Sequence, residues 1–394
     1  MRTQVGIIGA GPAGLLLSHL LHLEGISSII IESRSRDYCE TRVRAGLLEQ
    51  NSVDLLNETG LAERMNKIAL PHDGVQFTFD DTYHRIDMTE LIGRRVTIYA
   101  QQEIVKDIIA VRLRDGGEIL FEAEARQVGG IDGDKPFIKF MHEGSEKTIE
   151  CDYIAGCDGF HGIARDSMPS SVVRGYDRVY PFGWLGMLIA AKPPSHELIY
   201  SHHPEGFTLF SMRAPEITRS YLQVPPDDDI KNWSEDRMWS EMRKRLGKHE
   251  GLELHEGEIM QASITPMRSY VSEPMRYGRL FLAGDSAHIV PPTGAKGMNL
   301  AMADVCVLAR ALIAKYKLNR NDYMESYSET CLKRVWRAEH FSWWMTTMLH
   351  PFYEASPFDL RRQIAELHTV FGSRSGQTLV AENYAGLPIV PWRP

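Results

Sequence analysis

The chain has 394 residues, 43% of them hydrophobic, and a formal net charge of -8 at pH 7. This length exceeds what one hydrophobic core usually organises, so we expect two domains with room for a helical appendage. The acidic balance and the lack of any lysine- or arginine-rich run exclude a nucleic-acid partner and favour small molecules.

The five cysteines indicate a reducing compartment. Their number is odd and no two form a CxxC pair, so they fit neither a disulfide framework nor a zinc site. Adjacent His202 and His203 would point to opposite faces of a strand, which also argues against a metal. No charged and apolar leader and no run of about 18 apolar residues is present, so we expect a cytoplasmic protein without a membrane span.

The first motif lies at the start of the chain. Residues 4–10 have the pattern of a buried strand and residues 12–24 that of a helix, with Gly9, Gly11 and Gly14 between and within them. The first glycine permits a tight turn, the second lets the backbone approach a pyrophosphate, and the third lets helix pack on strand. A second strand at 27–32 ends in Glu32, near the spacing expected for a ribose-binding acid. This context predicts a dinucleotide site and leaves nicotinamide and flavin both open.

Two later segments repeat the change from strand to turn. Residues 151–163 lead into Asp158, a position that an ordinary turn would explain equally well. Residues 278–285 form a buried strand that delivers Asp285, and a helix is expected to begin near Gly297. In a doubly wound sheet these strand ends meet at one crevice, so an elongated ligand such as FAD could touch both loops. An ordinary buried strand, turn and helix is the alternative.

Residues 196–224 change to the alternation typical of antiparallel strands, which predicts an inserted second domain. Within it, Ser211 and Arg213 fall on the apolar face with Phe207 and Leu209. A buried guanidinium needs a carboxylate, either from a ligand or from an internal salt bridge, and the pattern alone leaves both open.

Several motifs together resemble the single-component FAD aromatic hydroxylases, and the resemblance covers nearly the whole chain. They are GAGPAG at 9–14 with Glu32, CDG at 157–159, GDSAHIVPPTGAKGMNLAMADV at 284–305, RVRAGLLEQ at 42–50, RVYPFGWLG at 178–186, HELIYSHHPEGF at 196–207 and ENYAGLP at 382–388. The resemblance implies an α/β fold with an FAD-binding Rossmann-like domain, an inserted antiparallel-sheet substrate domain and a C-terminal helical region. Their expected bounds are 1–73, 99–180 and 265–345 for FAD, 74–98 and 181–264 for substrate, and 346–394 for the helical interface region.

The resemblance also implies the cofactor contacts. The residues expected at FAD are Gly9, Gly11, Ala13, Gly14, Glu32, Arg42, Arg44, Gln101, Asp158, Asp285, Gly297, Met298 and Asn299. Those expected at NADPH or NADH are Ser33, Arg34, Tyr38, Arg44, His161 and Arg268, since no second dinucleotide motif exists. NADPH-specific members carry arginine where this chain has Ser33, and Asp37 would repel a 2′-phosphate, so we expect use of both nucleotides.

By the same resemblance, the substrate is a phenolic acid, 4-hydroxybenzoate, hydroxylated beside its phenol with O₂ by way of a flavin hydroperoxide. Ser211, Arg213 and Tyr221 would bind the carboxylate. Tyr200 and Tyr384 would take up the phenolic proton, with Pro292 and Thr293 nearby and His72 as the relay to solvent. A related phenolic acid as substrate, a pyridine-nucleotide dehydrogenase and a binding protein without turnover stay open as alternatives. A homodimer through the helices after 322 is a further expectation.

Overall fold

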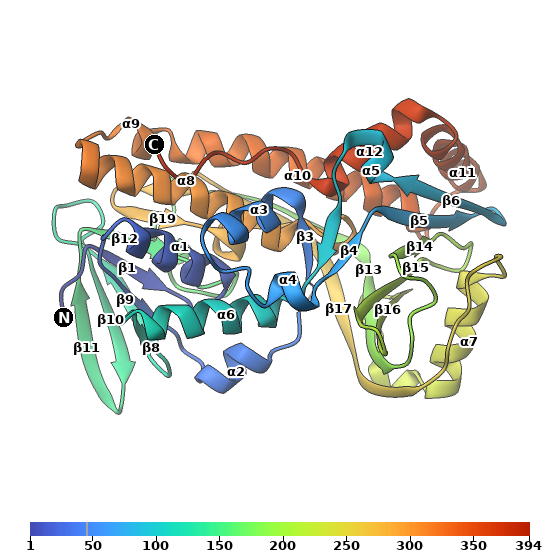
Figure 1. Cartoon of the computed structure of the whole chain (residues 1–394), viewed down its shortest axis with the longest axis horizontal. Coiled ribbons are helices and arrows are strands. Elements are labelled where there is room, and N and C mark those ends of the chain that lie inside the picture. Colours follow the sequence, from blue (N-terminus) through green and yellow to red (C-terminus); the bar gives the residue numbers. More distant parts are fainter. Residues whose placement is uncertain (45) are drawn as a thin grey trace.

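The computed structural model describes residues 1–44 and 46–394. Two large sheets occupy the left and right halves of Figure 1, and long helices run along the top. Two three-stranded sheets complete the strands, in the orders β11 (Ser145–Glu150), β10 (Phe137–His142), β9 (Glu124–Gly129) and β3 (Leu47–Glu49), β7 (Val96–Ile98), β4 (Leu70–His72).

The first large sheet has a parallel centre. Its order is β18 (Arg276–Tyr277), β19 (Leu280–Leu282), β12 (Tyr153–Gly156), β1 (Val5–Ile8), β2 (Ser28–Ile31), β8 (Glu118–Leu120). β1 pairs in parallel with β2 on one side and β12 on the other, and helix α1 (Pro12–Leu23) connects β1 to β2. The predicted strand, helix and strand at the start of the chain are therefore confirmed.

The two faces of this sheet are covered differently. Ile7 points to α1, since a Cβ at Gly14 would lie 3.1 Å from its side chain, and α1 packs on α6 (Gln101–Arg114) and α8 (Gly297–Leu318). Gly6 points to the opposite face, where a Cβ would lie 2.7 Å from Ile138 of β10. The Rossmann-like fold class is confirmed, with an antiparallel sheet instead of a helix packed on β1 at the second face.

The second large sheet is mostly antiparallel. Its order is β20 (His288–Ile289), β17 (Glu258–Glu273), β13 (Arg174–Ala190), β16 (Ile217–Val224), β15 (Thr208–Ala214), β14 (Ile199–Ser201), β5 (Gly74–Phe79), β6 (Thr82–Asp87). The antiparallel pairing expected within 196–224 is confirmed, although β14 pairs with β5 in parallel. β13 and β17 are long and run through the expected domain boundaries at 180 and 264, which ties the two halves of the molecule together.

The remaining helices cover these sheets. They are α2 (Arg36–Thr41), α3 (Gln50–Glu58), α4 (Met65–Ile68), α5 (Met88–Ile92), α7 (Glu235–Leu246), α9 (Asp322–Glu325), α10 (Tyr327–Leu349), α11 (Pro357–Phe371) and α12 (Arg374–Ala385). The apolar faces of α11 and α12 share one core with Phe77 and Tyr200 of the second sheet. Residues from the C-terminal region therefore pack on the second sheet at β5 and β14.

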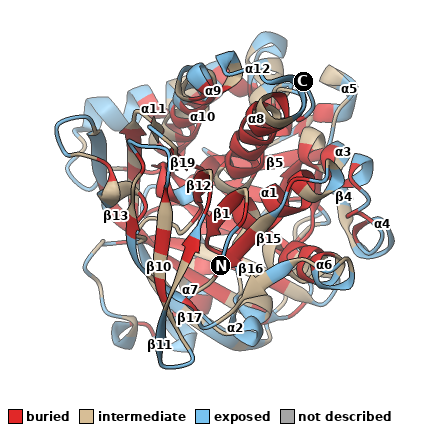
Figure 2. Cartoon of the chain, turned by 90° about the vertical axis from the view of Figure 1, so that its left-hand side faces the viewer, coloured by how far each residue is buried: buried red, intermediate tan, exposed pale blue. Residues whose placement is uncertain are grey.

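Helix α8 lies in the core of the first domain. By length and composition it could cross a membrane, but 78% of its most apolar window is buried inside the protein. Figure 2 shows α8 and α1 as buried helices next to each other. This burial is the pattern of a core helix.

Candidate functional site

Where β1 leads into α1, a side chain would clash with the backbone at Gly9 and Gly14 but not at Gly11. A Cβ at Gly9 would lie 2.3 Å from the carbonyl oxygen of Cys157, and one at Gly14 would lie 2.0 Å from that of Gly9. A Cβ at Gly11 would have no heavy atom within 4 Å. The turn therefore leaves free space at the N-terminus of α1, where backbone amides favour an anionic group. Ala13, one residue into the helix, is buried.

Glu32 lies beside this turn, as its spacing predicted. It follows the last residue of β2, and its carboxylate accepts hydrogen bonds from the amides of Ala10 and Arg34, each at 2.8 Å. The acid is thus held at the carboxyl edge of the parallel strands.

Asp285 lies in a short 3-10 turn, 284–286, after β19. Its side chain is exposed, yet burial by surrounding protein raises the pKa of its carboxyl, so it lies in a hollow that solvent can enter. Gly284 has a positive φ of 67°, and a Cβ there would lie 3.2 Å from Ala301 and 3.5 Å from Ala13. The structure therefore brings the two predicted loops together.

The start of α8 is open in the same way. A Cβ at Gly297 would meet nothing within 4 Å, and Met298 is half-buried. Asn299 differs, because its side chain is fully used inside the protein: it accepts from the amide of Glu49 and the hydroxyl of Ser52 and donates to two carbonyls. Only its backbone is free for the expected cofactor contact.

The remaining residues expected at FAD lie on three segments. Asp158 follows β12; its Oδ2 accepts from the Ala164 amide at 2.8 Å, while Oδ1 is buried without a partner in the described chain. Burial raises the pKa of this carboxyl to about 6. Arg42 and Arg44 are exposed after α2, and Gln101 is the first residue of α6.

Tyr200 and Tyr384 form a buried pair. Their hydroxyl oxygens are 2.7 Å apart, and the Tyr200 hydroxyl donates to the carbonyl oxygen of Thr293 at 2.9 Å. Because the Tyr200 proton points to this carbonyl, the Tyr200 oxygen accepts a hydrogen bond from the Tyr384 hydroxyl. Burial raises the pKa of both phenols, and the bond from Tyr384 partly offsets this for Tyr200.

Pro292 and Thr293 differ in their positions. Pro292 is exposed, and the carbonyl of Thr293, not of Pro292, contacts Tyr200. The Thr293 hydroxyl accepts from Thr346 of α10 at 2.8 Å. This carbonyl contact had no signal in the sequence.

Arg213 carries a guanidinium that has no counterion among the residues the structure describes. A register shift between Met212 and Ala214 leaves Arg213 out of the β15–β16 ladder, and such bulges redirect side chains. Its Nε is buried without a hydrogen-bond partner, and no acid within residues 1–44 and 46–394 forms an ion pair with it. Burial lowers the pKa of Arg213, and Tyr221 opposes this shift. Ser211 is buried on the same strand. The internal salt bridge left open by the pattern is therefore not found among the described residues.

His72 is buried but does not contact the tyrosine pair. Its Nε2 lies 3.2 Å from the sulfur of Met212, and neither tyrosine hydroxyl bonds to it. Burial lowers the pKa of this imidazole to about 4, so it is neutral at physiological pH. A direct relay from Tyr384 to His72 is not present; a bridging group would be needed.

The residues expected at the nicotinamide nucleotide lie near two surfaces. His161 is exposed beside Phe160, whose ring lies between the guanidinium groups of Arg165 and Arg268 at 4.7 and 4.4 Å. Arg268 also pairs with Asp177 at 2.5 Å. On the other surface, Arg34 stacks on the ring of Tyr38 at 5.3 Å and Ser33 hydrogen bonds to Glu32.

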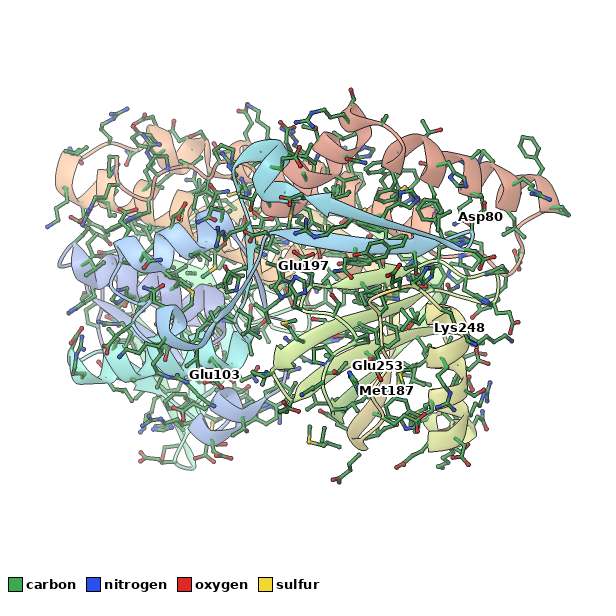
Figure 3. All side chains as sticks on the ribbon, turned by 45° about the vertical axis from the view of Figure 1, so that its right-hand side comes forward. Asp80, Glu103, Met187, Glu197, Lys248 and Glu253 are labelled. Carbon is green, nitrogen blue, oxygen red and sulfur yellow. The ribbon has the colours of Figure 1, made fainter. Side chains whose placement is uncertain are left out.

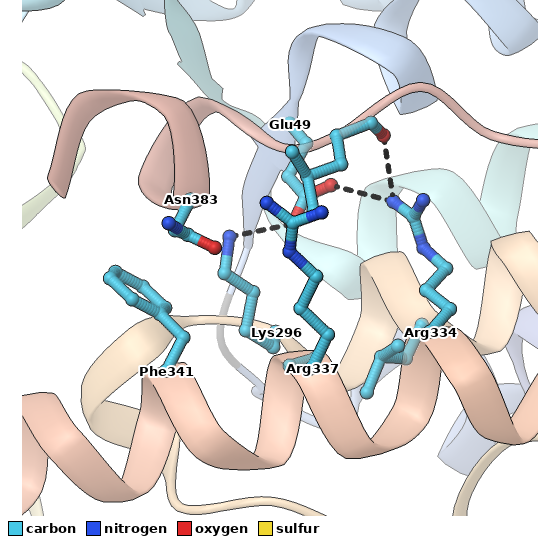
Figure 4. Close-up of a pocket in the computed structure, with 9 residues that line it drawn as sticks. Glu49, Lys296, Arg334, Arg337, Phe341 and Asn383 are labelled. Carbon is cyan, nitrogen blue, oxygen red and sulfur yellow. Dashed lines mark hydrogen bonds and ion pairs between the residues drawn. The ribbon is translucent and has the colours of Figure 1, made fainter. Parts of the chain in front are cut away.

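A buried ion cluster at the start of α8 was not predicted from the sequence. Lys296 donates to Glu49 at 2.7 Å and to the Tyr384 carbonyl at 3.1 Å, and Arg334 reaches the other Glu49 oxygen at 3.3 Å. Figure 4 shows these side chains lining a pocket with Arg337 and Phe341. The cluster fixes the backbone at Tyr384 to the start of α8. No group of three or more potential metal ligands occurs in the described part of the chain.

Comparison with known proteins decides the family. A family model for an FAD binding domain matches residues 2–342. The p-hydroxybenzoate hydroxylase of Acinetobacter baylyi is 47% identical to this chain, over 98% of this chain and 96% of that protein. The chain belongs to the FAD-dependent aromatic hydroxylases. It is accordingly a flavoprotein monooxygenase that binds FAD and uses NAD(P)H and O₂ as co-substrates.

More distant aromatic hydroxylases share the fold. A 3-(3-hydroxy-phenyl)propionate/3-hydroxycinnamic acid hydroxylase of Mycobacterium is 24% identical over 79% of this chain and 54% of its own length. The crystal structure of p-nitrophenol 4-monooxygenase from Pseudomonas putida superposes with a TM-score of 0.82 at 18% identity, covering 98% of this chain and 100% of that one.

The geometry fits the cofactor of this hydroxylase family. Space is open at Gly11 and Gly297, the Asp285 side chain is exposed beside them, and Asp158 holds a buried oxygen without a partner in the described residues. The family match thereby decides between a flavin and a nicotinamide dinucleotide as the bound group.

Proposed function

We propose that this protein hydroxylates 4-hydroxybenzoate at the 3-position, giving 3,4-dihydroxybenzoate, with O₂ and NAD(P)H. The observation that carries the proposal is the combination of an unpaired guanidinium, Arg213, with a buried phenol pair, Tyr200 and Tyr384, on one sheet. The name of the 47% identical relative supports the same substrate.

The spacing of these groups suits a para-substituted benzoate. Tyr200 pairs with Leu209 across β14 and β15, and Arg213 is four residues further along β15. Four residues of regular strand advance the backbone by about 13 Å, so the two groups are offset along the sheet. A benzene ring with a carboxylate at one end and a hydroxyl at the other presents two polar groups with a similar offset.

In this proposal, each end of the substrate has a separate role. Arg213 binds the carboxylate through paired hydrogen bonds, with Ser211 and Tyr221 beside it. Tyr200 accepts the phenolic proton as its own proton turns from the Thr293 carbonyl to Tyr384, and Tyr384 gives up its proton through a bridging group to His72 and solvent. The substrate becomes a phenolate, whose ring donates more electron density than that of a phenol. Bound FAD supplies the redox chemistry, taking a hydride from NAD(P)H and activating O₂ for transfer of one oxygen atom. The aromatic core around Tyr200 excludes water, which protects coupling of oxygen use to product.

We place FAD along the two loops that meet at Gly284. The N-terminus of α1 at Gly11 would hold the pyrophosphate, Glu32 the ribose, Asp285 the ribityl chain, and the amides from Gly297 onward the flavin ring. Asp158, Arg42, Arg44 and Gln101 would line the remaining edge.

One assay tests the proposal. Oxidation of NADH and NADPH is followed with and without 4-hydroxybenzoate, and the product is identified by mass. Stimulation by 4-hydroxybenzoate with 3,4-dihydroxybenzoate as product supports it, and 4-methylphenol, which lacks the carboxylate, is the matched control. Equal stimulation by 4-methylphenol, or preference for a related phenolic acid, would contradict the assigned substrate.

We further propose that both nicotinamide nucleotides are used. Arg36 is paired with Glu40 at 2.6 Å and Arg34 lies over Tyr38, so neither side chain is held free for a 2′-phosphate, and Asp37 adds a negative charge. Comparable kcat/KM for NADH and NADPH supports this, and a preference above about 100-fold contradicts it because a strict phosphate contact is worth that much.

The expected division into FAD, substrate and C-terminal segments, a cytoplasmic location and a homodimer also stay proposals. All five cysteines are free, which agrees with a reducing compartment. Light scattering of the purified protein tests the dimer, and limited proteolysis near residues 180 and 264 tests the division.

A further inference from the structure

The turn that carries Asp285 is held at both ends by one buried oxygen. Asp304 Oδ2 accepts a hydrogen bond from the Gly284 amide at 3.0 Å and another from His288 Nε2 at 2.6 Å. Gly284 and His288 flank Asp285 and Ser286, so this single carboxylate closes the turn. Both Asp304 and His288 are buried, at 2% and 1% exposure.

Asp304 belongs to the helix whose first residues face the cofactor space. It lies seven residues after Gly297, two turns into α8, or about 10 Å along the axis. The same helix therefore presents its open N-terminus and anchors the neighbouring turn. Movement of the turn relative to α8 would separate the two surfaces that must bind one ligand.

We propose that Asp304 is a positioning residue for FAD: by its charged contact with His288 and its bond to Gly284, it fixes the turn that presents Asp285 to the cofactor. The proposal rests on FAD binding alone and is independent of the substrate proposed above.

The other bonds of the turn are neutral. Ser286 donates to the carbonyl of Gly156 at 2.6 Å, the Ala287 amide to the carbonyl of Gly284, and the Ser272 amide to that of Ala287. Charge-assisted hydrogen bonds are roughly twice as strong as neutral ones, so the Asp304 contact contributes most. A Cβ at Gly284 would lie 3.2 Å from Ala301 and 3.5 Å from Ala13, so only a residue without a side chain lets the turn approach α1 and α8 this closely.

His288 supplies the charge in this contact. Burial lowers the pKa of its imidazole, but Asp304 of α8, Asp285 of the turn and Glu339 of α10 outweigh burial and raise it above the ordinary value. Glu339 is itself buried, and burial raises its pKa to about 7. As pH rises through the raised pKa of His288, the proton is lost and the buried Asp304 carboxylate keeps only a neutral donor. The contact that holds the turn to α8 then weakens.

The test follows release of FAD from the diluted holoprotein by recovery of flavin fluorescence, between about pH 6 and about pH 10, a range that spans a histidine pKa raised by a carboxylate. Asp304→Asn should weaken FAD binding about tenfold at neutral pH, since a charge-assisted bond is replaced by a neutral one. His288→Gln keeps a donor but carries no charge at any pH, so at neutral pH it should release FAD as readily as the wild type does at alkaline pH, and its release should not change with pH.

Glu197→Gln is the matched control. Glu197 (labelled in Figure 3) is equally buried and binds Arg85 through two bonds of 2.7 Å, but it lies two residues before β14 of the second sheet. Its loss should lower stability and leave the pH profile of FAD release unchanged. A wild-type profile in His288→Gln, or FAD affinity in Asp304→Asn no weaker than in Glu197→Gln, would overturn the proposal. If Asp304→Asn does not fold, the His288→Gln profile still decides.

Discussion

The hydroxyl oxygens of Tyr200 and Tyr384 are 2.7 Å apart, although 184 residues separate them in the chain. Tyr200 comes from β14 of the substrate-side sheet and Tyr384 from the last helix, α12. The carbonyl of Thr293, on the loop before α8, completes the set. Three distant segments thus meet in one set of hydrogen-bonded groups.

Tyr200→Phe should separate reduction from hydroxylation. The change removes the acceptor for the phenolic proton and leaves FAD contacts intact, so reduction by NAD(P)H continues while product formation falls about 100-fold, the low end for a general base. Oxygen use and product yield are measured together. Tyr180→Phe, a buried tyrosine bonded to Ser269 at 3.1 Å, is the control. Unaltered product yield in Tyr200→Phe would refute the proton role.

Arg213→Gln should weaken substrate binding without destabilising the free protein. Loss of a charged, paired contact to a carboxylate costs about 2–3 kcal/mol, or roughly 30- to 150-fold in Kd. The substrate-free protein should keep or gain stability, because a buried guanidinium without a counterion in the described chain is removed. Perturbation of flavin absorbance by 4-hydroxybenzoate gives the Kd, and thermal unfolding gives the stability. A large drop in melting temperature would show that Arg213 has a protein partner.

Substitution by alanine should affect FAD affinity at Gly11 and protein stability at Gly14. Gly11→Ala meets no atom within 4 Å and should fold, but the new methyl group enters the space assigned to the pyrophosphate and should weaken FAD binding at least about tenfold. Gly14→Ala places a Cβ 2.0 Å from the Gly9 carbonyl and should destabilise the protein itself. Apoprotein melting temperature and FAD affinity separate the two effects. Normal FAD affinity in a folded Gly11→Ala protein would move the pyrophosphate elsewhere.

His350 should make the free energy of unfolding decrease at acidic pH. Its Nε2 accepts from the Trp184 indole at 2.8 Å and its Nδ1 donates to the Thr346 carbonyl at 2.9 Å, so a second ring proton would face a donor. Burial lowers the pKa of this imidazole to about 3, below the unfolded value of about 6.5.

The unfolded chain therefore binds the extra proton first, and stability from His350 is present above pH 6.5 and lost as pH falls toward 3. When the pH falls from about 7 to about 5, the titration of His350 lowers the free energy of unfolding by about 2 kcal/mol. Urea unfolding of wild type and His350→Gln at both pH values measures it, with the other titrating groups shared. An equal acid response of both proteins would contradict the assignment.

Local patterns in the sequence predicted the parts that depend on local geometry. Gly9 and Gly11 lie in the expected turn, Gly14 lies in the first turn of α1, and α8 begins at Gly297, because strand period, glycine spacing and helix composition act over a few residues. The bulge at Arg213, the Thr293 carbonyl and the Met212 contact of His72 could not be predicted, since each depends on the register or packing of distant strands. The hydrogen bonds of Asp304 with Gly284 and His288, and those of Lys296 with Glu49 and Tyr384, likewise join segments that are distant in the chain. Neither Asp304 nor Lys296 has a spacing that points to its partners.

The position of Tyr384 on α12 also bears on when the enzyme becomes active during synthesis. Ribosomes add about 5–20 residues per second and domains fold as they emerge, so the FAD-side fold has time to form before the last helix is released. Asn51 and Arg94 then hold the tail by the carbonyls of Leu387 and Gly386. A nascent chain interrupted before α12 would carry the nucleotide fold but not Tyr384, and Tyr200 would lack its hydrogen-bond partner.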